Sequence, residues 1–225
     1  MKKLLLAATA IAALASPAMA DTTWDFASGV AINTFVDLGA SANFTADGIT
    51  INAAGFSGPS ALGGAPNSPL DEKNFSTALE TGLGLQADPT GDGEIFGNGT
   101  GSVGSLIRVN MTNARNAGLV GLSFQMDSTT AGEGWLVFGG NNANGTGATQ
   151  VAKGTDDILH MLSGPAGLLD YYFFAFDPST YVAGVSTNVL LTEVDAIATP
   201  LPGAALLFGS GLLGLISLGR HRRQA

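Results

Sequence analysis

The segment Ala42-Asn43-Phe44-Thr45-Ala46-Asp47-Gly48-Ile49-Thr50-Ile51-Asn52 decides the fold of this chain. Apolar and polar side chains alternate on both sides of Asp47-Gly48, and a period of two is typical of strands that place one face in a core. An Asp-Gly pair between two such runs favours a two-residue turn with positive φ angles. The segment therefore predicts a β-hairpin over residues 42–52.

Strand-like segments recur along the rest of the chain, some as alternation and some as continuous apolar runs. They lie at residues 107–111, 122–126, 135–138, 171–176, 181–185 and 189–196. The one helix expected is short, at residues 157–162. Many short strands joined by Gly-rich turns favour an all-β fold, an antiparallel β-sandwich of jelly-roll-like type.

The charge of the chain is unevenly distributed. All 18 Asp and Glu residues lie between Asp21 and Asp195, where only four cations oppose them, so this part carries a net charge of −14. An acidic domain argues against nucleic-acid binding, which requires a basic face. The sequence has no cysteine, which excludes disulfides, thiolate metal sites and thiol catalysis.

The N-terminal segment 1–20 has the layout of a secretory signal peptide. Lys2 and Lys3 precede an apolar run at 4–15, and Ala18 and Ala20 supply the small side chains that a signal peptidase reads. Cleavage after Ala20 is expected, so that domain 21–198 is exported.

The C-terminal segment 199–225 has three parts. A proline motif leads into an uncharged, mostly apolar stretch. Counted from Leu201 to Gly219 this stretch has 19 residues, which as a helix would span about 29 Å of bilayer. The stretch ends in a basic stop made by Arg220, Arg222 and Arg223, which the positive-inside rule keeps in the cytoplasm. We expect a C-terminal transmembrane helix, with residues 196–200 as the hinge that precedes it.

This layout resembles the VPLPA-CTERM variant of the PEP-CTERM family of sorting signals. The resemblance rests on the span, on the basic end and on the motif Thr199-Pro200-Leu201-Pro202-Gly203, in which Thr199 replaces the usual Val and Gly203 the usual Ala. It implies an exosortase-type transpeptidase as partner, cleavage near the motif, and a Gram-negative-type bacterium. The protein would cross the inner membrane, stay anchored in transit, and reach the cell surface or the extracellular space.

Several residues in the domain are candidates for a site. Asp88, Asp92 and Glu94 concentrate carboxylates in a Gly-rich turn, which suits Ca²⁺, although the spacing does not follow the EF-hand pattern. The alternative is an acidic turn that serves backbone geometry. Five aromatic residues could form a carbohydrate platform or belong to the core: Trp24, Trp135, Tyr171, Tyr172 and Tyr181.

Enzymatic sites have weaker support in the sequence. A Ser-His-Asp triad would have to use His160 with Asp156 or Asp157, and no Gly-x-Ser-x-Gly motif exists. A glycan hydrolase needs two facing carboxylates about 5–10 Å apart. The candidates are Glu94, Glu133 and Asp177, whose alternative role is that of solvated loop acids.

The leading functional interpretation is a non-enzymatic structural or adhesive protein of the cell surface, of an exopolysaccharide or of a biofilm matrix. It follows from the family resemblance. A carbohydrate-binding module, with or without Ca²⁺, is the alternative, and a secreted glycan hydrolase is the third class.

Overall fold

The hairpin predicted from residues 42–52 is present in the computed structural model. Strand β3 (Ser41–Ala46) pairs antiparallel with β4 (Ile49–Ser57), with Ala46 opposite Ile49 next to the turn. Asp47 and Gly48 have φ angles of 49° and 77°, as a two-residue turn of type I′ requires. The prediction is confirmed, and the Asp-Gly pair explains why the turn falls there.

The structure describes residues 21–26, 31–58, 64–75, 80–87, 91–97, 103–129, 133–162, 168–181 and 188–198. Nearly all regular elements among them are antiparallel strands in two sheets. Sheet A contains β1 (Thr22–Asp25), β2 (Thr34–Gly39), β5 (Leu70–Phe75), β6 (Glu80–Leu85), β7 (Ile95–Phe96), β9 (Leu119–Asp127), β12 (Leu159–Leu162) and β14 (Asn188–Ala198). Sheet B contains β3, β4, β8 (Ser105–Asn110), β10 (Trp135–Gly140), β11 (Thr149–Gly154) and β13 (Tyr171–Phe176).

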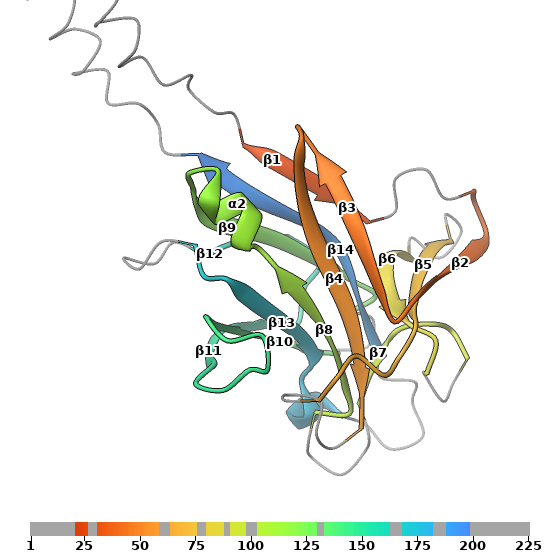
Figure 1. Ribbon diagram of the computed structural model, residues 1–225. Coiled ribbons are helices and arrows are strands. Elements are labelled where there is room, and N and C mark those ends of the chain that lie inside the picture. The colour runs from red at the N-terminus through yellow and green to blue at the C-terminus, as the bar shows by residue number, and fades with distance from the viewer. Residues whose placement is uncertain are drawn as a thin grey trace, which may run out of the picture. The chain divides into compact units, whose positions relative to one another are not determined.

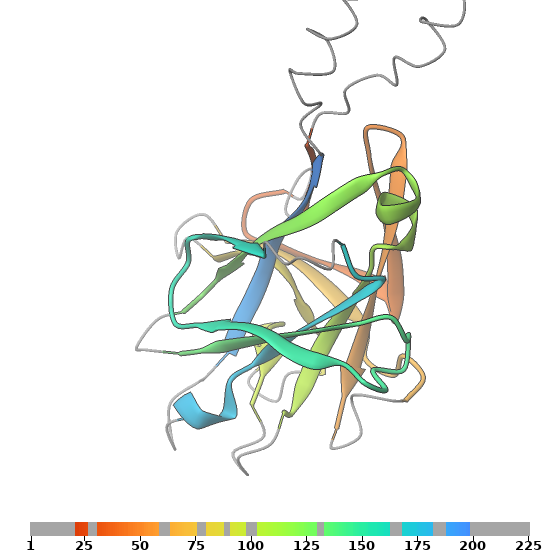
Figure 2. The same ribbon diagram turned by 90° about the vertical axis from the view of Figure 1, so that its left-hand side faces the viewer.

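The two sheets form the layers of a β-sandwich (Figure 1). Sheet A has the order β12-β9-β14-β6-β5-β2, with β1 and β7 also paired to β14, and sheet B has the order β11-β10-β13-β8-β4-β3. The view turned by 90° shows β14 in blue and the β3–β4 hairpin in orange on opposite sides of the packed interior (Figure 2).

The chain crosses repeatedly from one sheet to the other. It passes from β4 to β5, from β7 to β8, from β8 to β9 and from β9 to β10 by changing sheets, and it does so again around β12 and β13. Apart from the pairs β3–β4, β5–β6 and β10–β11, neighbours in a sheet are therefore distant in sequence, as in jelly-roll folds. The expected all-β, antiparallel, jelly-roll-like sandwich is confirmed.

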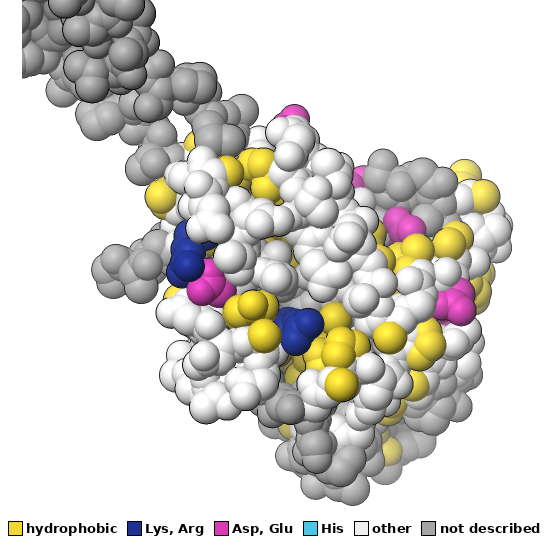
Figure 3. All heavy atoms as spheres, viewed as in Figure 1, with side chains coloured by type: hydrophobic (Ala, Val, Ile, Leu, Met, Phe, Trp, Pro, Cys, Tyr) yellow, Lys and Arg dark blue, Asp and Glu magenta, His cyan; other side chains and the backbone are white. Residues whose placement is uncertain are grey.

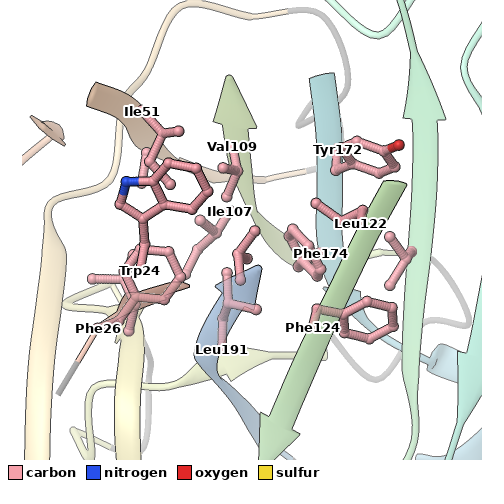
Figure 4. Packing of buried hydrophobic residues seen from close by; sticks show 14 of the residues in the cluster. Trp24, Phe26, Ile51, Ile107, Val109, Leu122, Phe124, Tyr172, Phe174 and Leu191 are labelled. Carbon is pink, nitrogen blue, oxygen red and sulfur yellow. The ribbon is translucent and has the colours of Figure 1, made fainter. Parts of the chain in front are cut away.

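The core lies between the sheets and is filled from both. Ile51, Val109 and Phe174 of sheet B are buried against Phe124 and Leu191 of sheet A (Figure 4). Trp24 and Phe26 close one end, and the Trp24 indole donates a hydrogen bond of 3.1 Å from Nε1 to the carbonyl oxygen of Ile49. Alternating positions of each strand therefore supply the core, as the period of two predicts.

A second apolar cluster lies on the other side of sheet B. It contains Ala54, Phe56, Leu106, Phe173 and Ala175, all 2% exposed or less. Strand β13 is thus buried on both faces over most of its length, which explains its continuous apolar run. The continuous apolar runs at 135–138 and 171–176 do form strands, and both strands are mostly buried.

Two predictions about local structure are wrong, and a third falls mostly on residues outside the described ranges. The helix predicted at 157–162 is wrong, because residues 159–162 form the edge strand β12, in which pairing with β9 outweighs local preference. The α-helix α2 (Thr112–Asn116) and the 3-10 helix η2 (Pro178–Thr180) lie elsewhere. Residues 196–198 are not a hinge, because they continue β14. Tyr181 precedes residues 182–187, outside the described ranges, and is not in a strand.

Candidate functional site

The predicted sorting and processing residues lie outside the described part of the chain. This applies to the signal peptidase site at Ala18 and Ala20, to the proline motif at residues 199–203, and to the basic stop at Arg220, Arg222 and Arg223. Among the residues that the structure describes, no helix combines the length and the apolar character needed to cross a bilayer. The transmembrane helix predicted in 199–225 stays a prediction.

The acidic turn proposed for Ca²⁺ is described only in part. Asp88 lies outside the described residues. Asp92 accepts a hydrogen bond of 2.9 Å on Oδ1 from the Asn188 side-chain amide, and Glu94 forms an ion pair with Lys73. No group of three or more His, Cys, Asp or Glu residues that could hold a metal ion occurs in the described ranges. The calcium site stays a prediction.

Lys73 and Glu94 form the centre of a buried polar network in sheet A. The Lys73 ammonium pairs with Glu94 and, at 2.7 Å, with Glu80, and the Lys73 and Glu94 side chains are 3% and 4% exposed. The Ser128 hydroxyl donates to Glu94 at 3.1 Å. Burial raises the pKa of Glu94 to about 7, against the opposing effect of Lys73. The network ties the segment 91–97 to β5 and β6, which is a structural role.

The other carboxylates considered for glycan hydrolysis also make structural contacts. Glu133 accepts a hydrogen bond of 3.0 Å on Oε1 from the Asn188 backbone N–H. Asp177 accepts one of 2.9 Å on Oδ1 from the Ser179 N–H and so caps η2. Both side chains are largely buried, and neither is a solvated loop acid.

His160 lies on the inner side of β12. Its Nε2 is 2.6 Å from Asp156 Oδ1, and its ring packs on Phe124 and Trp135, with centroids 5.6 and 4.6 Å away. The structure therefore brings together the predicted His-Asp pair, whereas Asp157 bonds to Thr129. Within the described ranges no serine or threonine hydroxyl hydrogen-bonds to His160. Its ring contacts place it at the edge of the core.

The five aromatic residues do not form one platform. Trp24, Trp135 and Tyr172 belong to the core, at 3% exposure or less. Tyr171 is half-buried on the outer face of sheet B, and Tyr181 is 38% exposed after η2. Tyr171 and Tyr172 point to opposite faces of β13, as consecutive strand residues must.

The two sheets differ completely in charge. The described strands of sheet B contain no acid and two cations, Arg108 and Lys153. The strands of sheet A contain a single cation, Lys73, together with His160 and eight acids: Asp25, Asp37, Asp71, Glu72, Glu80, Asp127, Glu193 and Asp195. The strands of sheet B are therefore free of acids, although the domain as a whole is acidic.

Arg108 is the central charge on this outer face. Its guanidinium carbon lies 5.1 Å from the Phe56 ring centroid and 5.8 Å from that of Tyr171, within cation–π range of both. Nη1 donates to the Ala143 carbonyl oxygen at 2.9 Å, and the buried Nε has no hydrogen-bond partner. Burial lowers the pKa of Arg108, yet an arginine stays charged in proteins. In Figure 3 a dark-blue basic group over β4 and β8 is bordered by yellow hydrophobic atoms.

A row of amides runs across sheet B beside Arg108. The register places Asn43 opposite Asn52, Asn52 opposite Asn110, and Asn110 opposite Tyr171. The Asn52 amide donates to Asn43 Oδ1 at 2.9 Å, which fixes the orientation of both side chains. Amides held in such a row can hydrogen-bond hydroxyl groups, and the neighbouring tyrosine ring can stack on a sugar ring. These four residues and Arg108 are hereafter the sheet B platform.

A hollow of about 470 Å³ lies on the opposite side of the hairpin, between β1, β2, β3 and β5. Phe44 and Leu38 contribute apolar surface to it, and Asp25 and Glu72 contribute carboxylates. Burial, followed by the charge of Asp25, raises the pKa of Glu72 to about 7. The hollow is thus acidic, in contrast to the platform.

The sequence placed Arg108 on the outward side of residues 107–111 but gave no reason to single it out. Its ring partners, Phe56 and Tyr171, come from β4 and β13, which are both far from β8 in the sequence. The usable signal was the absence of acids from the strands over 107–111 and 171–176.

Comparison with known proteins gives little. No protein-family model and no curated protein matches the chain. Among solved structures, the K2 cleaved adhesin domain of Lys-gingipain (Kgp) aligns with 80% of this chain and 100% of that chain, at 13% identity and a TM-score of 0.35. A likeness at this TM-score carries no argument about what the protein does.

Proposed function

We propose that this chain is an exported structural or adhesive protein of the cell surface or extracellular matrix, without enzymatic activity, and sorted through residues 199–225 by an exosortase-type transpeptidase. The observation that carries the proposal is that the first and last strands of the sandwich lie side by side. Thr22 of β1 pairs with Ala196 of β14, and Asp21 Oδ1 accepts a hydrogen bond of 2.9 Å from the Ala198 N–H.

This arrangement suits a domain that is processed at both ends. Cleavage after Ala20 would leave Asp21 as the first residue, where its side chain is already bonded to the last residue of β14. Cleavage near the proline motif would fall just beyond Ala198. Neither cut would remove a residue of a strand, so the sandwich would keep its hydrogen bonds after processing.

The proposal is tested by intact-mass analysis of protein from the cell surface and the medium. The wild type is compared with a Pro200→Ala, Pro202→Ala double variant. A wild-type species that starts at Asp21 and ends within residues 199–203, and that is lost in the variant, is the expected result. A species that keeps the chain through Ala225 would mean a plain membrane anchor and would refute sorting by an exosortase.

A carbohydrate-binding module is the second candidate, and the sheet B platform favours it. The platform combines ordered amides, a half-buried tyrosine and an arginine in contact with aromatic rings on the outer face of sheet B. Binding to a panel of polysaccharides, measured with and without a chelator, separates this function from a passive structural role. Loss of binding on chelation would support the calcium-dependent form, and no binding to any polymer would leave the structural role.

A further inference from the structure

We infer that the sheet B platform binds carboxylate-bearing polysaccharides of the uronic-acid type, with Arg108 as the group that recognises the carboxylate. This inference deepens the carbohydrate-binding form of the proposed function and rests on it. It concerns the ligand class, which the proposal above leaves open.

The first support is the state of Arg108. Of the four cations between residues 21 and 198, Lys73 is buried against Glu94 and Glu80, and Arg115 pairs with Asp170 at 2.8 Å. In the described part of the chain Arg108 has no carboxylate partner, although the domain has 18 acids. The planar guanidinium is the protein group best suited to bind a carboxylate through parallel hydrogen bonds.

The second support is the way in which Arg108 is held. Phe56 and Tyr171 flank the guanidinium, and the Ala143 carbonyl accepts from Nη1. A stacked arginine with one fixed hydrogen bond loses less conformational entropy on binding than a free side chain does. The site is therefore organised before any ligand arrives.

The third support is charge complementarity. A polyuronate would be repelled by the strand acids of sheet A, and it would meet no strand acid on sheet B. Lys153 also lies on the outer face, opposite Leu136 in the register of β10 and β11, but β10 and β13 separate its strand from that of Arg108. The strand charges therefore disfavour an anionic polymer at sheet A and do not oppose it at sheet B.

The fourth support is the amide row, which extends away from Arg108 across β8, β4 and β3. Sugar rings next to the bound carboxylate would offer hydroxyl groups to Asn110, Asn52 and Asn43, and one ring face to Tyr171. A linear polysaccharide that lies across the strands would contact Arg108 and the amide row at the same time.

The test uses the full chain in mild detergent and oligogalacturonate as the probe. Binding is measured by calorimetry in EDTA, so that calcium cannot bridge the polymer to the acids of sheet A. The matched control ligand is the fully methyl-esterified oligomer, which has the same sugar rings and no carboxylate. We expect the acid form to bind at least about tenfold more tightly than the ester.

Three variants locate the site. Arg108→Gln should weaken binding of the acid form at least about tenfold and leave binding of the ester unchanged, whereas Lys153→Gln should change either by no more than about twofold. Arg108→Lys keeps the charge, and an intermediate loss is expected because the fork of donors is gone. It also serves as the second variant if Arg108→Gln does not fold, as judged by circular dichroism.

Two sets of results would overturn the inference. One is equal binding of acid and ester, or binding of the acid form that survives Arg108→Gln. The other is binding that appears only when calcium is present, which would assign the polymer to the acids of the other sheet. A failure here, with tail processing and surface location intact in the mass analysis, would refute only the ligand class. Loss of those properties would refute the proposed function instead.

Discussion

Sheet A and sheet B build one core from the same apolar alternation, but they differ in the charge of the strand residues that do not face this core. Sheet A holds its charges partly by burying them, as Lys73 and Glu94 show, and partly by leaving carboxylates such as Asp25 at the surface. Sheet B has no strand acid, and its outer face alternates buried rings with amides and one stacked arginine. The two layers therefore satisfy their polar groups in different ways: sheet A pairs its buried charges, whereas sheet B keeps its amides half-buried or exposed.

The segment 91–97 explains part of the difference. It crosses the outer side of β6, where the Gly93 carbonyl accepts a hydrogen bond from the Leu85 N–H at 3.1 Å. Polar groups beneath it lose water and need internal partners, which the Lys73 network supplies. The amides of sheet B keep contact with water and need no such network. Four predictions test this contrast, from the largest expected effect to the smallest.

Lys73→Met should cause the largest loss of stability, about 3–5 kcal/mol, because it leaves the buried Glu94 without its counter-charge. The measurement is the free energy of unfolding by urea at pH 7.5. Lys153→Met is the matched control in sheet B, where the lysine is exposed, and it should cost less than about 0.5 kcal/mol. Equal losses of unfolding free energy in the two variants would show that the Lys73–Glu94 ion pair contributes no more to stability than an exposed lysine does.

Gly84→Ala should destabilise the protein by about 2–4 kcal/mol, because a Cβ at this position would clash with the Gly93 carbonyl oxygen. The crossing segment would have to move and the hydrogen bond to Leu85 would break. Gly121→Ala in the same sheet is the control, since its nearest contact is the Ile197 side chain at 3.3 Å. Thermal unfolding checks both. A Gly84→Ala protein as stable as the wild type would mean that the segment is loosely held.

Glu72→Gln should change the pH dependence of stability. The folded pKa of Glu72 is raised from 4.5 to about 7 by burial and by Asp25, so the native state binds more protons than the unfolded state between these values. Stability due to Glu72 is therefore present below pH 4.5 and is lost as the pH rises to about 7. The variant should lack this loss and have a higher melting temperature than the wild type at pH 7.5.

The control for that experiment is Asp47→Asn, at the exposed turn of the sheet B hairpin. It should keep the wild-type slope of melting temperature against pH from 4.5 to 7.5. The slope of the wild type also includes Glu94, whose pKa is raised in the same direction, so Glu72→Gln should flatten the slope without abolishing it. An unchanged slope in Glu72→Gln would contradict the burial argument.

Thr45→Ala should have the smallest effect, about 0.5 kcal/mol, through loss of the 2.8 Å hydrogen bond between the Thr45 and Thr50 hydroxyls on the surface of sheet B. Urea unfolding of the variant and of Thr50→Ala should give similar values, since either change removes the same contact. A loss as large as that of Gly84→Ala would show that the outer face of sheet B also stabilises the fold.

Much of the architecture could be predicted from short-range patterns. The turn at Asp47-Gly48 and the alternation in residues 107–111 and 122–126 identified strands correctly, because a half-buried strand has a period of two. The segment 157–162 was assigned wrongly, since the short sequence Leu-His-Met-Leu at 159–162 has no decisive local preference. Its state depends on pairing with β9, which is separated from it in the chain by β10 and β11.

The candidate sites were predicted less well than the fold. Asp92 and Glu94 are near neighbours in the sequence, but they bond to different partners, Asn188 and Lys73. His160 and Asp156 did come together, because one short loop joins them. Arg108 was not singled out, since the rings that contact it come from two other strands.

The sequence by itself determined the all-β class, the hairpin and the acidic balance of residues 21–198, because these depend on local pattern and on composition. It also carries the flanking signals from which export is predicted. Only the tertiary structure decided which strands share a sheet, and with it the gathering of the strand acids in sheet A and of Arg108, Phe56 and Tyr171 on sheet B. The physical reason is that β-pairing joins segments far apart in the chain, so the chemistry of a sheet face is a property of strand order.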